Sequence, residues 1–240
     1  MVGASSGLGE AMARQLHAAG ANVALVARRK DELDRIAAEL NAARPGSAFA
    51  LAHDVRDFAE APAALEQCVA ALGGLDFVAY AAGILPPLAE SEWSFEKDRA
   101  TMEVNVLGAM AWLNPIAARF EAARGGTILG VSSVAGERGR RGHPSYGASK
   151  AALTTYLEAL RNRLARYGVT VTTVKPGFID TAMTKGRAGL FWLISPEEAA
   201  SQALALARRG VASGYVPARW APLMLVVKAI PDFVFKKLNF

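Results

Sequence analysis

Tyr146 and Lys150 are the residues of this chain with the clearest capacity for chemistry. They lie four positions apart at the start of a segment whose apolar residues recur at helical spacing, which places both side chains on one helix face. A phenol normally keeps its proton until about pH 10, and a neighbouring ammonium favours the phenolate and lowers that pKa toward neutrality. The pair therefore predicts a tyrosine that exchanges a proton with a substrate at working pH.

Ser133 lies just beyond an apolar run, residues 127–131, that predicts a buried strand. The end of this strand and the start of the helix with Tyr146 can converge on one substrate oxygen. A serine hydroxyl there would hold a carbonyl or alcohol oxygen beside the phenol. A tyrosine and a lysine four positions apart also occur often by chance, so this chemistry depends on the rest of the chain.

The composition indicates one globular domain. With 240 residues, 52% of them hydrophobic and 20% charged, the chain is long enough to bury a full core. The net charge of +5 favours anionic partners, whether a phosphorylated cofactor, an acidic carrier or a membrane surface. The basic residues are scattered, whereas a nucleic-acid-binding protein would gather them on one face.

The single cysteine, Cys68, cannot form an internal disulfide and suits a reducing compartment. The three histidines, His17, His53 and His143, have no metal-site spacing, so we expect no metal. The first motif follows the start of the chain at once, so we expect no signal peptide. Together these features favour a cytoplasmic protein.

Gly3, Gly7 and Gly9 open the chain and lead into a helical pattern that runs to His17. Glycines before a helix let backbone amides at the helix N-terminus approach a pyrophosphate. The strand that follows, residues 22–27, ends at Arg28, Arg29 and Lys30. In dinucleotide-binding folds an acid at this place binds the ribose hydroxyls, whereas an arginine accommodates a 2′-phosphate, so the sequence favours NADP over NAD.

Strands and helices alternate through most of the chain. Further strands are expected at residues 48–53, 75–83, 127–131 and 169–175, and helices at 31–43, 58–72, 95–123 with an interruption at Pro115, from 145, and after 195. This alternation predicts βαβ units and an α/β, doubly wound parallel sheet between two layers of helices, the Rossmann fold.

These motifs, in this order, resemble the short-chain dehydrogenase/reductase family over residues 1–216. The matching positions are Gly3-x-x-x-Gly7-x-Gly9, Asp54, Ala81-Ala82-Gly83, Asn105, Ser133, Tyr146-x-x-x-Lys150, and Pro176-Gly177 with Thr181. The remaining residues, 217–240, form an apolar and basic tail that is expected to pack on this domain or on a partner.

The resemblance implies a catalytic role for four residues. Ser133 would position the substrate oxygen, and Tyr146 would be the acid/base. Lys150 would lower the tyrosine pKa and hold the ribose, and Asn105 would support a water relay. Hydride transfer belongs to the nicotinamide.

The resemblance also implies a set of cofactor contacts. Asp54 and Val55 would meet the adenine, Gly83 the adenine ribose, and Arg28 with Ser5 the 2′-phosphate. Ile179 and Thr181 would meet the carboxamide end. The full expected set is Gly3, Ser5, Ser6, Gly7, Leu8, Gly9, Arg28, Arg29, Asp54, Val55, Ala82, Gly83, Tyr146, Lys150, Pro176, Gly177, Ile179 and Thr181.

Two departures from the family pattern carry expectations of their own. The fourth strand has Tyr80-Ala81-Ala82-Gly83 where an Asn-Ala-Gly ending is usual, so a hydrogen bond that supports the sheet is lost or replaced. Only Met1 and Val2 precede Gly3, so the central first strand is truncated, and each unpaired buried backbone group would cost about 1–3 kcal/mol. We expect either a native reading frame that starts upstream or a marginally stable protein that binds cofactor poorly.

Two segments bear on the substrate. A basic stretch between the catalytic residues holds Glu137, Arg138, Arg140, Arg141 and His143, and is either a solvated cluster or a landing site for an anionic head such as a phosphate or carrier thioester. Residues 190–194 are apolar, which suggests an apolar ligand or a neighbouring subunit. Ser195 and Glu198 then predict a capped helix.

The tail is rich in apolar residues but is interrupted by Pro222, Lys228, Pro231 and Asp232, so it is too broken to span a bilayer. Two interpretations stay open: burial in an oligomer interface, or shallow insertion at the inner membrane surface with lysines toward anionic headgroups. By analogy with the family, a homodimer or homotetramer is expected.

The sequence as a whole predicts an NADP-dependent oxidoreductase that interconverts a ketone and a secondary alcohol. Its substrate would be apolar, in the manner of lipid metabolism, or an acyl thioester. A catalytically silent NADP-binding regulatory or scaffold protein is the main alternative, and the intact Ser133, Tyr146 and Lys150 speak against it. An epimerase or dehydratase would usually need a longer substrate domain than the space after Pro176 allows.

Overall fold

A computed structural model describes residues 1–187 and 189–238, and its strands form a parallel sheet. The strands are β1 (Val23–Ala27), β2 (Ala48–Ala52), β3 (Phe77–Tyr80), β4 (Thr127–Val131), β5 (Thr170–Pro176) and β6 (Ser213–Val216). They pair in the order β2-β1 and β3-β4-β5-β6, all in parallel register. Strands such as β1 and β4 are apolar on both faces because helices cover both.

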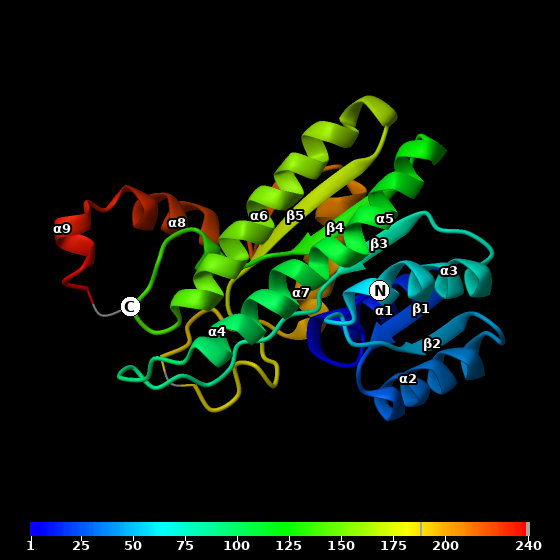
Figure 1. Ribbon diagram of the computed structural model, residues 1–240, viewed down its shortest axis with the longest axis horizontal. Coiled ribbons are helices and arrows are strands. Elements are labelled where there is room, and N and C mark those ends of the chain that lie inside the picture. Colours follow the sequence, from blue (N-terminus) through cyan, green and yellow to red (C-terminus); the bar gives the residue numbers. More distant parts are fainter. Residues whose placement is uncertain (188, 239–240) are drawn as a thin grey trace.

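The helices cover the two faces of this sheet (Figure 1). They are α1 (Gly7–Ala18), α2 (Lys30–Ala43), α3 (Ala61–Leu72), α4 (Phe95–Met102), α5 (Gly108–Ala123), α6 (Pro144–Leu164), α7 (Pro196–Arg208), α8 (Trp220–Ala229) and α9 (Asp232–Phe235). Helices α1, α2 and α7 pack on one face, and α3, α5 and α6 on the other. The predicted three-layer, doubly wound fold is confirmed.

The first strand is reduced to one residue, as predicted. Val2 bridges Val26 of β1 and Tyr80 of β3 and so joins the two halves of the sheet. Its N–H donates to the carbonyl of Ala79 at 2.9 Å, and its carbonyl accepts from the N–H of Ala81 at 2.8 Å. The amine of Met1 donates to the carbonyl of Ala24 at 2.8 Å. Val2 therefore forms the backbone hydrogen bonds of one residue of the central strand.

A cavity of about 320 Å³, which we call the slot, lies between the amino ends of β1 and β3. Its walls are apolar and come from both helix layers, including Leu16, Leu65, Cys68, Leu72, Phe77, Trp112 and Ile116. Apolar walls without a filling side chain lose the dispersion contacts of a close-packed core. The one-residue first strand therefore leaves a packing defect at the centre of the sheet.

The long helical segment is interrupted at a different place from the predicted one. Pro115 lies inside α5, which continues through it. The break is instead a π turn, Glu103–Leu107, that separates α4 from α5 and contains Asn105. Such turns insert an extra residue into a helix and often occur at functional sites.

Helix α7 begins as predicted, because the hydroxyl of Ser195 accepts a hydrogen bond from the N–H of Glu198 at 3.1 Å. No helix of the described residues is both long enough and apolar enough to cross a bilayer.

The tail packs on the domain through α8 and lies beside the segment that leads into α6 (Figure 1). Trp220, Met224 and Val227 are buried against Val134. Other apolar residues of the tail face outward: Leu225, Val226, Phe233 and Val234. Phe240, which the sequence analysis assigned to this apolar tail, lies outside the described residues.

Candidate active site

A cavity of about 430 Å³, the cleft, opens where β1, β3, β4 and β5 end. Most of the predicted site residues line it: Gly3, Ser5, Ser6, Gly7, Leu8, Gly9, Arg28, Arg29, Val55, Ala82, Gly83, Ser133, Tyr146, Lys150, Pro176, Gly177, Ile179 and Thr181. Asn105 and Asp54 do not line it. The carboxyl ends of parallel strands are where ligands of open α/β sheets bind.

The cleft brings the three candidate catalytic residues together. Ser133 follows β4, while Tyr146 and Lys150 come from the first two turns of α6. The buried Lys150 donates from its Nζ to the carbonyl of Val131 at 3.0 Å, and Nζ lies 5.8 Å from the centre of the Tyr146 ring. The hydroxyl of Ser132 donates to the carbonyl of Lys150 at 2.9 Å and so ties α6 to the end of β4.

The predicted lowering of the Tyr146 pKa by Lys150 is wrong in this structure. Burial raises the pKa of Tyr146, and this effect outweighs a hydrogen bond with Ser133 and the charges of Arg187 and Arg140, which act in the opposite direction. The phenol is therefore protonated at neutral pH and ready to donate.

Burial also lowers the pKa of Lys150 to about 8, because desolvation disfavours its ammonium form. The side chain therefore still carries most of its charge at pH 7.

Asn105 is fully buried in the π turn, and its amide connects two segments. Its Oδ1 accepts from the N–H of Ile84 at 2.8 Å, and its Nδ2 donates to the carbonyl of Ile84 at 3.1 Å and to the hydroxyl of Ser149 at 3.0 Å. The hydroxyl of Ser149 in turn donates to the carbonyl of Tyr146 at 2.8 Å. Asn105 thus holds the segment after β3 against the helix that carries Tyr146.

Tyr80 replaces the sheet contact that the unusual end of β3 was expected to lose. Its buried hydroxyl donates to the carbonyl of Val104 at 3.1 Å, inside the same π turn. Burial raises the pKa of Tyr80, so the hydroxyl stays a donor.

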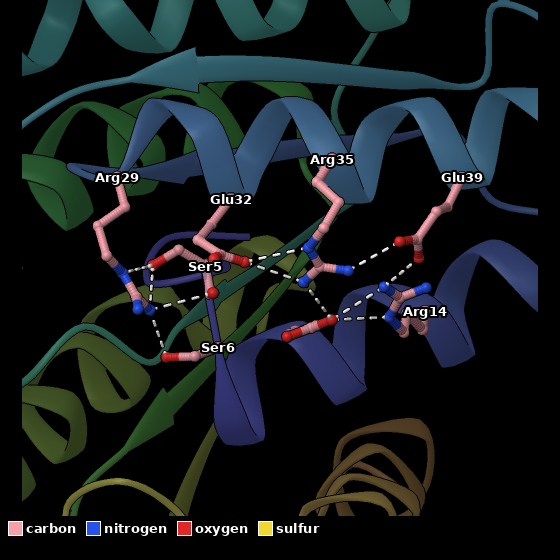
Figure 2. A network of polar contacts seen from close by, with 8 residues as sticks. Ser5, Ser6, Arg14, Arg29, Glu32, Arg35 and Glu39 are labelled. Carbon is pink, nitrogen blue, oxygen red and sulfur yellow. Dashed lines mark hydrogen bonds and ion pairs between the residues drawn. The ribbon is translucent and has the colours of Figure 1, made fainter.

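The glycine turn and the end of β1 form the other end of the cleft. At Gly9, a Cβ would lie 2.0 Å from the carbonyl oxygen of Gly3, so only glycine lets α1 start this close to the turn. Figure 2 shows Arg29 reaching over the turn, where its Nη2 donates to the hydroxyls of Ser5 at 2.9 Å and Ser6 at 2.6 Å. Arg28 is exposed, with Nη1 at 4.0 Å from a carboxylate oxygen of Asp54.

Asp54 does not line the cleft. Its carboxylate pairs with the Arg56 guanidinium at 2.6 Å, and this hydrogen bond holds the pKa of Asp54 below its ordinary value. The residues on either side, His53 and Val55, line the cleft instead.

Four aromatic rings, which we call the aromatic group, gather beside the loop after β5: Phe178, Phe191, Trp192 and Trp220. Phe191 stacks on Trp220 with ring centres 5.2 Å apart. The loop returns to the domain through a bridge between Ile179 and Ile194. The apolar run at 190–194 is therefore packed in part against the tail.

Sequence reasoning missed residues that position the site. Ser132 and Ser149 act on α6 through hydrogen bonds, and Ala182, Met183 and Thr184 line the cleft. The sequence did offer a signal for the two serines, because Ser132 directly precedes Ser133 and Ser149 directly precedes Lys150. Among the described residues, no group of His, Cys, Asp and Glu side chains could hold a metal ion.

The arrangement can polarise an oxygen and transfer a proton to it. A hydroxyl, a protonated phenol and a buried ammonium line one end of a cleft whose other end has two arginines and the start of α1, which has no side-chain cap. This combination is typical of oxidoreductases that work with a bound dinucleotide.

Comparisons with known proteins agree. The family model for short chain dehydrogenases matches residues 1–188, and the protein belongs to this family of oxidoreductases. An uncharacterised oxidoreductase of Mycobacterium tuberculosis is 32% identical over 234 residues, which cover 96% of this chain and 92% of that protein.

Two solved structures share the fold. A short-chain dehydrogenase from Sphingobium yanoikuyae in complex with NADPH has a TM-score of 0.82 and 26% identity, covering 97% of this chain and 95% of that one. A short-chain dehydrogenase from Mycobacterium paratuberculosis bound to NAD has a TM-score of 0.79 and 26% identity. The match covers 89% of this chain and 93% of that one.

Proposed function

We propose that the protein is an NADP-dependent oxidoreductase that interconverts a ketone and a secondary alcohol on an apolar substrate. The observation that carries this proposal is the convergence of Ser133, Tyr146 and Lys150 at one end of a cleft that begins at a glycine turn. Structural relatives bind NADPH or NAD, which supports a nicotinamide cofactor.

The residues present fit such a cofactor. The turn leaves no room for a side chain at Gly9, so backbone amides at the start of α1 can face a pyrophosphate. Gly83 and Lys150 lie together in the cleft, where a Cβ on Gly83 would approach Lys150 Nζ to 3.3 Å. Lys150 can therefore hold a ribose hydroxyl while its charge stays close to Tyr146.

Each catalytic residue has a distinct task. The bound cofactor supplies the hydride in reduction and takes it in oxidation. Ser133 donates a hydrogen bond to the substrate oxygen, and Tyr146 gives that oxygen its hydroxyl proton to complete the alcohol. The raised pKa of Tyr146 keeps the phenol in the form that carbonyl reduction needs, and the ammonium of Lys150 stabilises the phenolate left behind.

The preference for NADP rests on two arginines. Arg28 and Arg29 both line the cleft at the end of β1, and Arg29 donates to the hydroxyls of Ser5 and Ser6. Guanidinium groups bind phosphate through charge-assisted hydrogen bonds, whereas the ribose hydroxyls of NAD would call for an acid there.

The catalytic assignment is tested by NADPH oxidation against a panel of ketones and acyl thioesters. Tyr146→Phe removes the proton donor and should lower kcat about 100-fold or more. Tyr156→Phe is the matched control, because that hydroxyl contacts Asn114 outside the cleft. A full rate in Tyr146→Phe would show that the assignment is wrong. NADPH binding without turnover of any substrate would favour the silent alternative.

The cofactor assignment is tested by equilibrium binding. Arg28→Ala should weaken NADPH binding about tenfold and leave NADH binding unchanged, since a hydrogen bond to a charged group contributes about 1.5–3 kcal/mol. Equal affinity for both cofactors, unaffected by this substitution, would exclude the preference.

A further inference from the structure

Helix α8 packs one face on the domain and exposes the other. Trp220, Met224 and Val227 are buried, and they pack with Val134. A stripe of exposed residues runs along the opposite side at helical spacing, and every member is apolar: Pro222, Leu225, Val226 and Ala229. The outward side of a surface helix normally carries charged and polar side chains. This stripe therefore lacks the side chains that suit contact with water.

Helix α9 continues the apolar surface. Its Phe233 is 65% exposed and its Val234 37%. Arg138 fixes the two helices relative to each other, because it donates to the carbonyl of Val227 at 2.8 Å and pairs with Asp232 at 2.8 Å. Figure 1 shows both helices at one end of the molecule, away from the sheet. We call these exposed residues of α8 and α9 the tail patch: Pro222, Leu225, Val226, Ala229, Phe233 and Val234.

The tail also carries much of the positive charge of the protein. Residues 217–238 contain four basic residues and one acid, so they hold a net +3 of the +5 of the whole chain. The acid, Asp232, is paired with Arg138. Lys236 and Lys237 are exposed, and neither pairs with a carboxylate in the part of the chain that the structure describes. Cations next to an apolar face complement a surface that is both apolar and anionic.

This charge disfavours a second copy of the chain as the partner. In a symmetric dimer the same surface of both subunits would meet, so the lysines of the two copies would lie in one interface. Like charges repel more strongly where water is excluded. The surface of a bilayer with anionic lipids has the opposite charge and offers an apolar layer directly below its headgroups.

We propose that the tail patch binds the surface of a bilayer that contains anionic lipids. Helix α8 would lie in the plane of that surface. The side chains of Leu225, Val226 and Phe233 would enter the boundary between headgroups and acyl chains, and Lys236 and Lys237 would lie among the headgroups.

The position of α8 connects this surface to the candidate active site. Its buried face packs with Val134, which directly follows Ser133. The basic loop, residues 137–143, is fastened to α8 through Arg138. A protein held by the tail patch would therefore keep its site close to the membrane, where an apolar substrate gathers. This consequence rests on the proposed function, whereas the binding itself does not.

Flotation of the full chain with vesicles tests the binding without any reaction. Vesicles of phosphatidylcholine with about one third phosphatidylglycerol should bind the protein at least about tenfold more strongly than phosphatidylcholine alone, because each lysine near an anionic surface adds about fivefold. Raising the salt concentration from about 0.1 M to about 1 M should weaken the binding, since it shortens the Debye length from about 10 Å to about 3 Å. Equal binding to both kinds of vesicle, or no binding to either, would overturn the proposal.

Two double variants locate the apolar contact. Leu225→Ser with Phe233→Ser removes two exposed side chains of the tail patch and should weaken binding to the anionic vesicles at least about tenfold. Trp93→Ser with Phe95→Ser is the matched control, because these side chains are 90% and 80% exposed at the start of α4, and it should bind like the wild type. The same loss in both variants would show that the tail patch is not the contact.

Two further variants locate the charge. Lys236→Gln with Lys237→Gln should weaken binding to the anionic vesicles at least about tenfold and leave binding to phosphatidylcholine within about twofold. Arg208→Gln with Arg209→Gln removes the same charge at the end of α7 and should bind like the wild type. An equal loss in both variants would mean that net charge, and not the tail, governs the binding.

Analytical ultracentrifugation identifies the other occupant. A wild-type dimer that Leu225→Ser with Phe233→Ser converts to a monomer, together with no binding to vesicles, would assign the tail patch to a subunit interface and overturn the proposal. Catalysis enters none of these measurements, so their failure would leave the proposed oxidoreductase function untouched, and a lack of turnover would leave the membrane contact untouched.

Discussion

Lys150 is an ammonium in the interior of the protein, held by the carbonyl of Val131. Its burial favours the neutral amine, which explains why its pKa falls from about 10.5 to about 8. The catalytic proposal needs the charged form. Burial of the Lys150 ammonium beside Tyr146 therefore destabilises the folded protein at neutral pH.

This cost predicts a pH dependence of stability. Between pH 8 and about 10 the unfolded chain still binds a proton at Lys150 that the folded protein has lost, so the free energy of unfolding should rise with pH. Each pH unit contributes about 1.4 kcal/mol, or about 3 kcal/mol across the window. Urea unfolding of the wild type and Lys150→Met at pH 8 and pH 10 measures it. The variant should lack this rise, and an identical pH dependence in both proteins would refute the burial argument.

At the residue scale, the sequence predicted which residues line the site better than it predicted the burial and contacts of their side chains. Ser133, Tyr146 and Lys150 meet as predicted because each follows a strand end or a helix start that the pattern marks. The direction of the Tyr146 pKa was wrong because burial, which sequence spacing does not reveal, exceeds the neighbouring charges. Asp54 does not line the cleft, and its carboxylate pairs with Arg56 two positions later, a contact that sequence spacing alone did not predict.

At the scale of elements, the slot is the main irregularity. Val2 joins β1 and β3 through backbone hydrogen bonds at one position only. Before that position, the amino ends of β1 and β3 face each other across an apolar cavity of about 320 Å³. Parallel strands pair through both backbone edges, so a strand of the right length would satisfy both neighbours at once.

An apolar extension before Met1 should therefore stabilise the protein. Four residues rich in valine would place about two side chains against the slot walls, and each buried valine contributes roughly 1.5 kcal/mol or more. A gain of about 3 kcal/mol raises the Tm of a domain this size by roughly 6–12 °C. Thermal unfolding followed by circular dichroism measures the change.

The control is a Gly-Ser extension of the same length, which adds backbone but no apolar side chain. It should give a small gain at most. Equal Tm values for the valine-rich extension and the unmodified chain would show that the slot does not accept a strand.

The order of strands and helices was predictable because glycine and proline residues separate segments of clear hydrophobic periodicity. The position of the break in the long helical segment was not predictable. Proline suggested an interruption at Pro115, but α5 tolerates it, and the break falls at a π turn where Tyr80 and Asn105 bind the backbone around it. Those contacts come from residues distant in sequence, which local patterns do not report.

At the scale of the whole molecule, the tail and the basic loop support each other. Arg138 donates to backbone carbonyls of α8 and to that of Ile230 just after it, and its guanidinium lies 4.0 Å from the centre of the Phe235 ring. Glu137 joins Lys175 of β5 to Lys228 of α8. The segment between Ser133 and Tyr146 thus depends on the last helices of the chain for its shape.

Loss of this anchor should loosen the loop. In Arg138→Gln, the loop loses its contacts with the tail, so trypsin should cut after Arg140 or Arg141 at least about tenfold faster, because cleavage follows local opening. Arg219→Gln is the control, since that arginine contacts Trp192 and not the loop. Limited proteolysis with mass spectrometry reads out the sites. Unchanged cleavage in Arg138→Gln would mean that the loop holds its shape without the tail.

The aromatic group also gives the molecule a built-in optical signal. Trp192 and Trp220 stand with ring centres 5.5 Å apart, one on the loop after β5 and the other on α8. The remaining tryptophans lie elsewhere, with Trp93 in solvent and Trp112 in the core. Because indole emission follows the polarity around the ring, any opening of that loop would change the fluorescence of the native protein, and ligand binding could be followed without a label.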